Sequence, residues 1–468
     1  MVILVDLAVK RKTILAVLSI LGLIVAIFFS IILWNQPVTG FNRMLVLDNF
    51  ALFFKIIFCG AAILVILAST DYVNKFQRFQ GEFYALILLS VVGMSFMAAT
   101  TELISIYIAL ETASIALYVL AAFLKDEKSS EAGLKYLLLG AISSAVLLYG
   151  MAMIFGLTGS THLGDIATFL RTQGLRSITA TPALLIAMVF IAAGFGFKIA
   201  SVPFQMWVPD VYEGAPTPVT AFLSVASKAA GFAVIIRVFS QAFGTPGWLS
   251  LDWGLLFAIL GALSMTVGNL AAISQTNIKR MLGYSSIAQA GYIMVGLAAI
   301  GLAAPSDQFA RSSVLFFLAS YALTNLGAFI AIIAITNETK TDLIEDFAGM
   351  FKRAPLLGLG LALCLISLTG IPPTAGFLAK YYIFNAGVSN NLTWLVVVAV
   401  INSVIAAYYY LRVVKVMYLG APKSEKPIPS SAALRIAMGL ACLGVLVVFV
   451  FPSFVLNAAV DAINLLTR

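Results

Sequence analysis

Hydrophobic residues occupy long blocks of this chain, and short polar stretches separate the blocks. Most blocks reach the roughly 20 residues that an α-helix needs to cross the hydrocarbon core of a membrane. The pattern predicts thirteen apolar helices, which cover residues 13–34, 51–70, 83–99, 101–124, 131–158, 182–213, 217–243, 253–274, 281–303, 312–336, 354–387, 393–419 and 433–456. We therefore predict an all-α polytopic membrane protein with a single membrane domain over residues 1–468.

Two of these helices are longer than a straight crossing requires, and both contain proline. The helix predicted at 182–213 includes Pro203, and the one at 354–387 includes Pro372 and Pro373. Proline interrupts the backbone hydrogen bonds of a helix. Lipid cannot satisfy the backbone groups that such a break frees, whereas protein or cavity water can. Broken helices at equivalent places of two repeats are typical of transporters.

The composition agrees with a membrane protein. Hydrophobic residues make up 62% of the 468 residues and charged residues only 10%, which excludes an ordinary soluble domain. The formal charge of +8 does not indicate nucleic-acid binding, because Lys and Arg in loops set the topology of membrane proteins. We expect no nucleic-acid partner.

The loop charges predict an orientation. Most loop Lys and Arg residues fall on the predicted side of the N-terminus, namely Lys10, Arg11, Lys12, Lys75, Arg78, Lys125, Lys128, Lys279, Arg280, Lys340, Lys352, Arg353, Lys423, Lys426 and Arg435. The other side carries chiefly Arg43, Arg171, Arg176, Arg311 and Arg468. By the positive-inside rule the N-terminus is cytoplasmic. The odd helix count then places the C-terminus outside the cell's inner, or plasma, membrane.

Residues that bind metals or redox groups are scarce. Three cysteines, Cys59, Cys364 and Cys442, lie far apart and form no CxxC pair, and the single histidine, His162, lies in a polar loop. These positions give no support to a metal site, an iron–sulfur cluster or a disulfide framework. We expect no cofactor and no metal in this chain.

Four ionisable side chains inside predicted helices are the main functional candidates, namely Glu111, Lys198, Lys228 and Lys380. A charge at the centre of a bilayer costs roughly 2.5–3.5 kcal/mol on insertion scales, so such residues usually face a bundle interior or a water-filled path. Lys198 lies at the first break, and Lys380 follows the second. Lys135 is a further candidate, although it lies only one turn into its helix, where a lysine also reaches the interface by snorkelling.

These side chains suit proton transfer. Burial disfavours the charged form of a lysine, and an approaching carboxylate favours it. We hypothesise that Glu111 and Lys198 form an ion pair, and that making and breaking this pair loads and releases a proton. The hypothesis requires the two residues to be close together in the fold.

Other charged residues are expected to have ordinary roles. Glu102, Lys55 and Arg237 lie near predicted helix ends, so we expect them to reach the membrane interface. Asp210 and Glu213 lie in the turn between two predicted helices, and we expect them to cap a helix rather than to form a gate.

Three long stretches are similar to a known family. They are WVPDVYEGAPTPVTAFLSVASKAA, SQTNIKRMLGYSSIAQAGY and GIPPTAGFLAKYY, in this order along the chain. They closely resemble the antiporter-like membrane subunits of respiratory complex I. The VYEGAPTP segment and Lys228 resemble subunit N, called subunit 2 in organelles, more than its L and M paralogues. The resemblance covers nearly the whole chain.

The resemblance implies two inverted five-helix repeats, roughly residues 83–243 and 253–419, with flanking helices at 13–70 and 433–456. It implies a proton-translocating subunit of an NADH:quinone oxidoreductase, which is assembled with other membrane subunits and coupled to quinone reduction elsewhere in the complex. Residues 1–12 look like the end of one more N-terminal helix that the family usually has. A real truncation and a misplaced start codon both account for this.

The resemblance also assigns roles by position. Glu111 looks like the helix carboxylate of the family, Lys198 like its partner lysine and Lys228 like the central lysine. Lys380 looks like the lysine of the second broken helix, and Lys135 matches a further family lysine.

Two alternatives stay open. The first is a subunit of a multisubunit sodium/proton antiporter, which shares the fold and the lysines but has no redox partner. The second is the membrane arm of a related hydrogenase. The VYEGAP and NIKRMLGYSSI segments favour the complex I subunit.

Overall fold

The computed structural model describes residues 2–8, 13–73, 79–172, 182–244, 247–303, 308–422, 424 and 426–464, most of which are helical. The helices are α1 Val2–Ala8, α2 Thr13–Ile32, α3 Asn49–Val73, α4 Gln80–Ala99, α5 Leu103–Ala121, α6 Glu127–Thr158, α7 Leu163–Thr172, α8 Pro182–Ile199, α9 Trp207–Gly214, α10 Thr217–Phe222, the π-helical turn η2 Leu223–Ser227, α11 Lys228–Gln241, α12 Gly247–Ile273, α13 Ile278–Leu302, α14 Gln308–Thr339, the 3-10 turn η3 Ile344–Phe347, α15 Met350–Arg353, α16 Pro355–Thr369, α17 Ala375–Ser389, α18 Thr393–Leu419, α19 Ala432–Val450 and α20 Pro452–Asn464.

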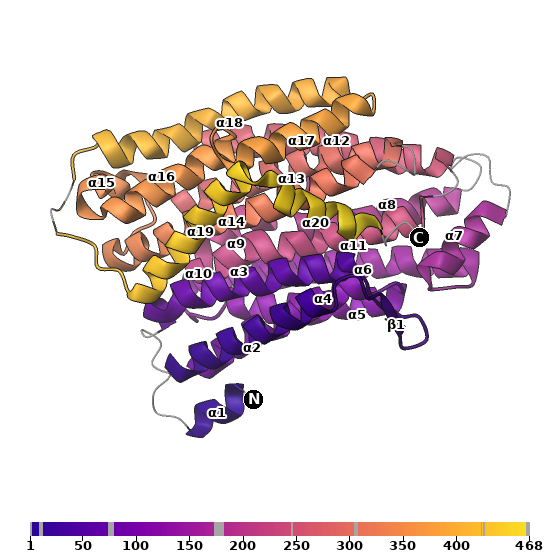
Figure 1. The fold of residues 1–468 in the computed structure, drawn as a ribbon, viewed down its shortest axis with the longest axis horizontal. Helices are drawn as coiled ribbons and strands as arrows, with labels where there is room; N and C mark the ends of the chain where they lie inside the picture. The colour runs from indigo at the N-terminus through magenta and orange to yellow at the C-terminus, as the bar shows by residue number, and fades with distance from the viewer. Residues whose placement is uncertain are drawn as a thin grey trace.

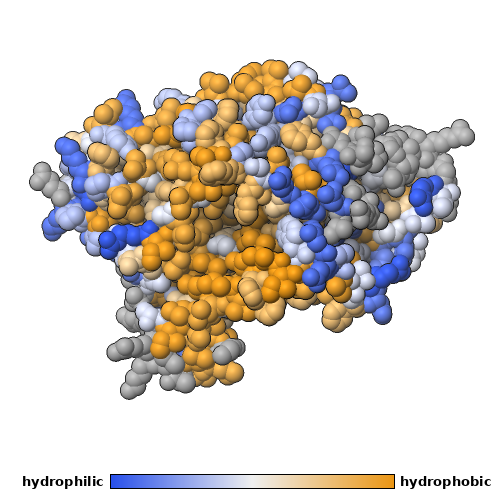
Figure 2. All heavy atoms as spheres, viewed as in Figure 1, coloured by the Kyte–Doolittle hydropathy of each residue, from blue (hydrophilic) through white to orange (hydrophobic). Residues whose placement is uncertain are grey.

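The long helices lie side by side and run roughly along one direction (Figure 1). Within the described residues, twelve helices are long and apolar enough to cross a membrane, and α16 is a shorter apolar helix. These helices account for the thirteen that the sequence predicts. Hydrophobic residues form a broad band across the middle of the surface, whereas hydrophilic residues gather toward its two ends (Figure 2). The predicted polytopic all-α membrane fold is confirmed.

Both predicted helix breaks are present. The sixth predicted helix divides into α8 and α9, which are separated by residues 200–206, and the eleventh divides into α16 and α17, separated by residues 370–374. At the first break, the Ser201 amide donates to the Gly196 carbonyl at 2.8 Å, and the Val202 amide donates to the Ser264 hydroxyl at 2.9 Å. These contacts satisfy backbone groups that lipid could not.

The most buried helices form the centre of the bundle. The membrane-crossing window of the segment Thr217–Gln241, which comprises α10, η2 and α11, is 100% buried, and that of α13 is 94% buried. The corresponding windows of α2, α6 and α19 are only about a third buried or less, so these helices lie at the periphery. The central segment carries Lys228, which is therefore held in protein rather than in lipid.

Some elements were not predicted. Two short strands, β1 Val38–Gly40 and β2 Leu45–Leu47, pair antiparallel with Val38 opposite Leu47. This hairpin lies at the same end of the bundle as α7, and α15 lies at the opposite end (Figure 1). The last predicted helix, 433–456, ends earlier, and α20 follows it as a separate helix. The inverted-repeat symmetry and the repeat boundaries stay predictions.

Arg237 does not reach the membrane interface, so that expectation is wrong. Its side chain is fully buried and makes two hydrogen bonds to the Asp48 carboxylate, at 2.9 and 3.0 Å. It also donates to the Ala98 carbonyl at 2.8 Å and lies over the Phe50 ring. A buried guanidinium needs such a complete set of partners. Arg237 therefore ties α11 to the start of α3, across 189 residues of sequence.

Glu102 is also more buried than expected. It is only 3% exposed and accepts hydrogen bonds from the amides of Ile104 and Ser105, so it caps α5.

Part of the predicted charge bias lies outside the described residues, namely Lys10, Arg11, Lys12, Lys75, Arg78, Arg176, Lys423 and Arg468.

Candidate functional site

Lys198 lies at the last turn of α8, directly before the first break. It is 3% exposed, and its amine donates to the Ser114 hydroxyl on α5 at 2.9 Å. Gly231 on α11 lets the end of α8 approach closely, because a Cβ there would lie 2.7 Å from a methyl carbon of Ile199 and 3.4 Å from Cγ of Lys198. The break therefore fixes a lysine between α5 and α11.

Glu111 lies one helical turn before Ser114 on α5, which places it on the same helix face as the serine that accepts from Lys198. It is half-buried and accepts a hydrogen bond from the Ser144 hydroxyl on α6. Among the ion pairs of the described residues, none joins Glu111 to Lys198 directly. Each group is held by its own serine, so the structure brings the predicted partners near each other without a direct contact.

Aromatic residues fill the space between Lys198 and the centre of the bundle. Tyr118 packs edge-on against Tyr136, with ring centres 4.6 Å apart, and Tyr136 stacks on Trp207 at 4.4 Å. The hydroxyls of Tyr136 and Ser227 are buried, and neither has a hydrogen-bond partner in this structure. Ser227 immediately precedes Lys228.

Lys228 begins α11, directly after the π-helical turn η2. π-Helical turns are rare and often occur at functional sites. The lysine is 1% exposed, and its amine donates to the backbone carbonyl of Ser286 on α13. The Ser286 hydroxyl lies 3.3 Å from the Tyr212 hydroxyl and 3.1 Å from the Tyr321 hydroxyl. Lys228 thus donates to one neutral acceptor, next to a cluster of hydroxyls from α9, α13 and α14.

A small cavity lies between this cluster and Lys380. Its volume is about 10 Å³, and its polar lining includes Gln289, Tyr321, Thr324, Ser367 and Lys380. That volume is close to one water-sized probe sphere. Tyr321 therefore contacts both the cluster around Lys228 and the cavity that reaches Lys380.

Lys380 lies in α17, after the second break, and is 6% exposed. Its amine donates to the Thr369 carbonyl at 2.9 Å and to the Ser403 hydroxyl at 3.2 Å, and it lies 4.4 Å from the centre of the Tyr292 ring. Thr369 is the last residue of α16, where a helix end carries partial negative charge. Both halves of the broken helix thus contribute to the lysine site.

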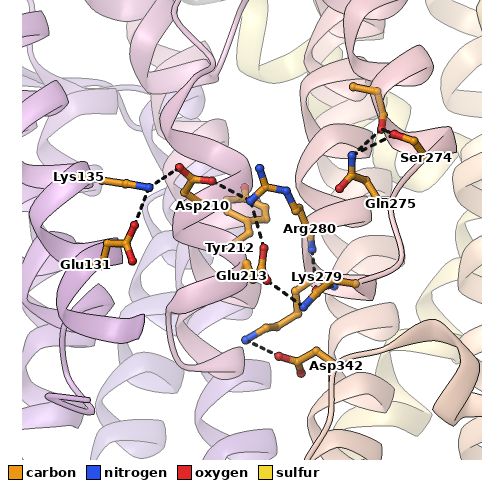
Figure 3. Close-up of polar contacts among 12 residues, drawn as sticks. Glu131, Lys135, Asp210, Tyr212, Glu213, Ser274, Gln275, Lys279, Arg280 and Asp342 are labelled. Carbon is orange, nitrogen blue, oxygen red and sulfur yellow. Dashed lines mark hydrogen bonds and ion pairs between the residues drawn. The ribbon is translucent and has the colours of Figure 1, made fainter. Parts of the chain in front are cut away.

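Lys135 occupies a different place. Its side chain is 42% exposed, and it pairs with Glu131 at 2.8 Å and with Asp210 at 2.7 Å. Asp210 also pairs with Arg280 at 2.7 Å, and Arg280 pairs with Glu213 at 3.1 Å (Figure 3). Asp210 and Glu213 therefore bridge helices and cap none, which corrects that expectation.

Similarity to known proteins identifies the family. Residues 100–406 match the family described as "NADH:quinone oxidoreductase/Mrp antiporter, TM". The chain is 49% identical over 460 residues to the NADH-quinone oxidoreductase subunit N of Dehalococcoides mccartyi, a match that covers 98% of this chain and 94% of that protein. The chain belongs to this family.

Two solved structures agree with this NADH:quinone oxidoreductase/Mrp antiporter family. A chain of respiratory complex I from Thermus thermophilus is 31% identical, with a TM-score of 0.82, over 97% of this chain and 96% of that one. A chain of the Mrp complex from Dietzia is 19% identical, with a TM-score of 0.86, over 100% of this chain and 95% of that one, and it shows the shared fold alone.

All five predicted site residues lie within the segment that matches the family. The structure places four of them, Glu111, Lys198, Lys228 and Lys380, beside hydroxyl or carbonyl groups of neighbouring helices, and it places the fifth, Lys135, in an ion-pair network with Glu131, Asp210, Arg280 and Glu213. The sequence did not single out the neighbouring tyrosines or the serines Ser114, Ser144 and Ser286, whereas Ser227 was visible as a small polar neighbour of Lys228. Of the residues that were not singled out, only Ser114, which lies three residues after Glu111, carried a local signal, because that spacing places both on one helix face.

Proposed function

We propose that this chain is the membrane-arm subunit N of an NADH:quinone oxidoreductase and that it translocates protons. The observation that carries this proposal is the 49% identity, over 98% of the chain, to a relative of that name. The chain is a subunit of a translocase, and the redox reaction takes place in other subunits. We expect no cofactor in this chain.

The proposed path begins at Glu111 and Lys198. When the carboxylate approaches, the protonated lysine is favoured; when it withdraws, the neutral amine is favoured and the proton leaves. Ser114 and Ser144 hold the two groups apart in the present arrangement. A small shift of α5 against α8 would then change the charge state of Lys198.

We propose a route for the released proton toward the other lysines. Hydroxyl groups both donate and accept hydrogen bonds, so they suit proton relay. Tyr136 and Ser227 lie on the way to Lys228, and Ser286, Tyr321 and the small cavity lie on the way to Lys380. We propose that Lys228 and Lys380 take up the proton in turn.

The chain is a multi-pass membrane protein of a hetero-oligomer. We propose that it contacts the other membrane subunits mainly through helix faces in the bilayer, because its helices leave few extramembrane residues. The proposed location is the inner, or plasma, membrane, with a cytoplasmic N-terminus and an external C-terminus. Reporter fusions at the two ends should report opposite compartments, and finding both ends on one side would contradict this topology.

Purification through a tag on this chain tests the function. We expect the tag to recover membrane and redox subunits together, and reconstituted vesicles to build a proton gradient when quinone is reduced. A sodium/proton antiporter would instead exchange sodium for protons in vesicles without any electron donor. Recovery of sodium exchange without quinone reductase activity would contradict the proposal.

A further inference from the structure

The short helix α9 presents two different faces. One face carries Asp210 and Glu213, which belong to the charged network of Figure 3. The other face carries Trp207 and Tyr212, which are buried in the bundle with relative exposures of 1% and 0%. The helix α9 has only eight residues and lies between residues 200–206 and residues 215–216, which are not helical, so any displacement moves it as a rigid unit.

The charged face ties α9 to both halves of the chain. Asp210 accepts from Lys135 of α6 through one oxygen at 2.7 Å, and from Arg280 of α13 through the other at 2.7 Å. Arg280 also reaches Glu213 at 3.1 Å. The side chains of Asp210, Glu213 and Arg280 are about one-third exposed. Partly exposed ion pairs add little to the free energy of folding. Folding stability alone therefore does not explain why these charged residues are placed together.

The buried face of α9 contacts the surroundings of two lysines. The Trp207 indole donates to the Phe197 carbonyl at 3.0 Å, directly before Lys198 in the chain. The Tyr212 hydroxyl lies 3.3 Å from the Ser286 hydroxyl, and the carbonyl of the same Ser286 accepts from Lys228. A displacement of α9 would therefore disturb both lysine sites together.

We propose that Asp210 and Arg280 are positioning residues for proton transfer. They clamp α9 between α6 and α13, and α9 in turn sets the positions of the groups next to Lys198 and Lys228. Neither residue exchanges the translocated proton. This inference rests on the proposed function, since it assumes that protons pass through these two lysines.

The first test is Asp210→Asn in the assembled complex. Asparagine keeps the size of the side chain and removes the charge that holds Lys135 and Arg280. We expect normal assembly on native gels, a proton-pumping rate reduced about fivefold, and a shifted pH profile of pumping, because small misplacements of reacting groups are costly. Asp210→Glu should restore most of the rate. A matched control is Asp165→Asn, which removes an exposed carboxylate paired with Arg43 at 3.9 Å and should change nothing.

The second test is Arg280→Lys. Lysine keeps the positive charge but lacks the planar fork that reaches two carboxylates at once. We expect full assembly with reduced pumping and the same shift of the pH profile. The double variant of Asp210→Asn and Arg280→Lys should be no worse than the more severe single variant, because the two residues act as one unit.

Two outcomes would contradict the proposal that Asp210 and Arg280 are positioning residues. One is full assembly with pumping and a pH profile like those of the parent in both single variants. The other is loss of assembly in both variants with no rescue by Asp210→Glu, which would make the pairs purely structural. Lys198→Ala, measured in parallel, separates this inference from the proposed function. If Lys198→Ala pumps like the parent, the proton path itself is wrong; if only the clamp variants pump normally, only the clamp is wrong.

Discussion

The two broken helices hold their lysines in different ways. At the first break, Lys198 belongs to the helix that ends there, and its amine donates to Ser114, one turn from Glu111. At the second break, Lys380 belongs to the helix that begins there, and its amine donates to Thr369, the last residue of the preceding helix. Similar interruptions of the chain thus produce different electrostatic surroundings.

The main difference is the nearby carboxylate. Glu111 lies one helical turn from Ser114, the acceptor of Lys198, whereas among the described residues the partners of Lys380 are a carbonyl, a hydroxyl and an aromatic ring. Lys380 also lines a cavity of about 600 Å³ next to Tyr381 and Val404, which are 54% and 71% exposed. On this account, Lys198 is switched from within the chain.

Of the variants that test the difference between the two breaks, Glu111→Gln should reduce proton pumping the most. Glutamine keeps a hydrogen-bonding side chain opposite Ser144 but carries no charge, so it cannot favour protonated Lys198. We expect proton pumping to fall about a hundredfold, which is within the usual range for loss of an acid–base group. Asp165→Asn is the matched control. Pumping by Glu111→Gln within twofold of the parent would show that the first break does not depend on a carboxylate.

Gly370→Ala tests the second break. Gly370 has a φ of +88°, and a Cβ there would lie 2.9 Å from Cδ of Lys380. Strain of this kind costs about 1–3 kcal/mol. We expect a lower free energy of unfolding in SDS titration of the purified chain. Gly231→Ala, on α11 against the end of α8, should cost less because the φ of Gly231 is not positive, so only the contact with Ile199 has to relax. Equal losses in the two variants would contradict this difference.

Removal of single hydroxyls should have the smallest effects. Ser114→Ala removes the acceptor of Lys198, whereas Ser403→Ala leaves Lys380 with the Thr369 carbonyl and the Tyr292 ring. A net hydrogen bond is worth about 0.5–1.5 kcal/mol, so we expect about a tenfold loss of pumping for Ser114→Ala at most and about twofold for Ser403→Ala. A larger loss of pumping for Ser403→Ala than for Ser114→Ala would contradict this difference between the two lysine sites.

The sequence predicted the helices and the breaks because these depend on local properties. Long apolar blocks and the prolines Pro203 and Pro372 are visible in short windows of the chain. Glu111, Lys198, Lys228 and Lys380 were visible for the same reason, since charge is costly at membrane depth. Their family roles came from the resemblance, and they remain proposals.

The remaining features depend on residues that are far apart in sequence. The partner of Arg237 is Asp48, 189 residues away, so no local pattern could predict that Arg237 is buried. Asp210 was expected to cap a helix, because a turn position favours capping and because its partners, Lys135 and Arg280, are 75 and 70 residues away. The serines that hold Glu111 and Lys198 apart gave too weak a signal among the many small residues of membrane helices.

The most direct test of the central claim is proton pumping by Lys198→Arg in membranes that carry the assembled complex. Arginine keeps the positive charge at the first break but does not release a proton in proteins. The account predicts that the variant assembles on native gels like the parent, while proton pumping coupled to quinone reduction is lost. If Lys198→Arg assembles and pumps like the parent, Lys198 is a structural contact and not part of a proton relay.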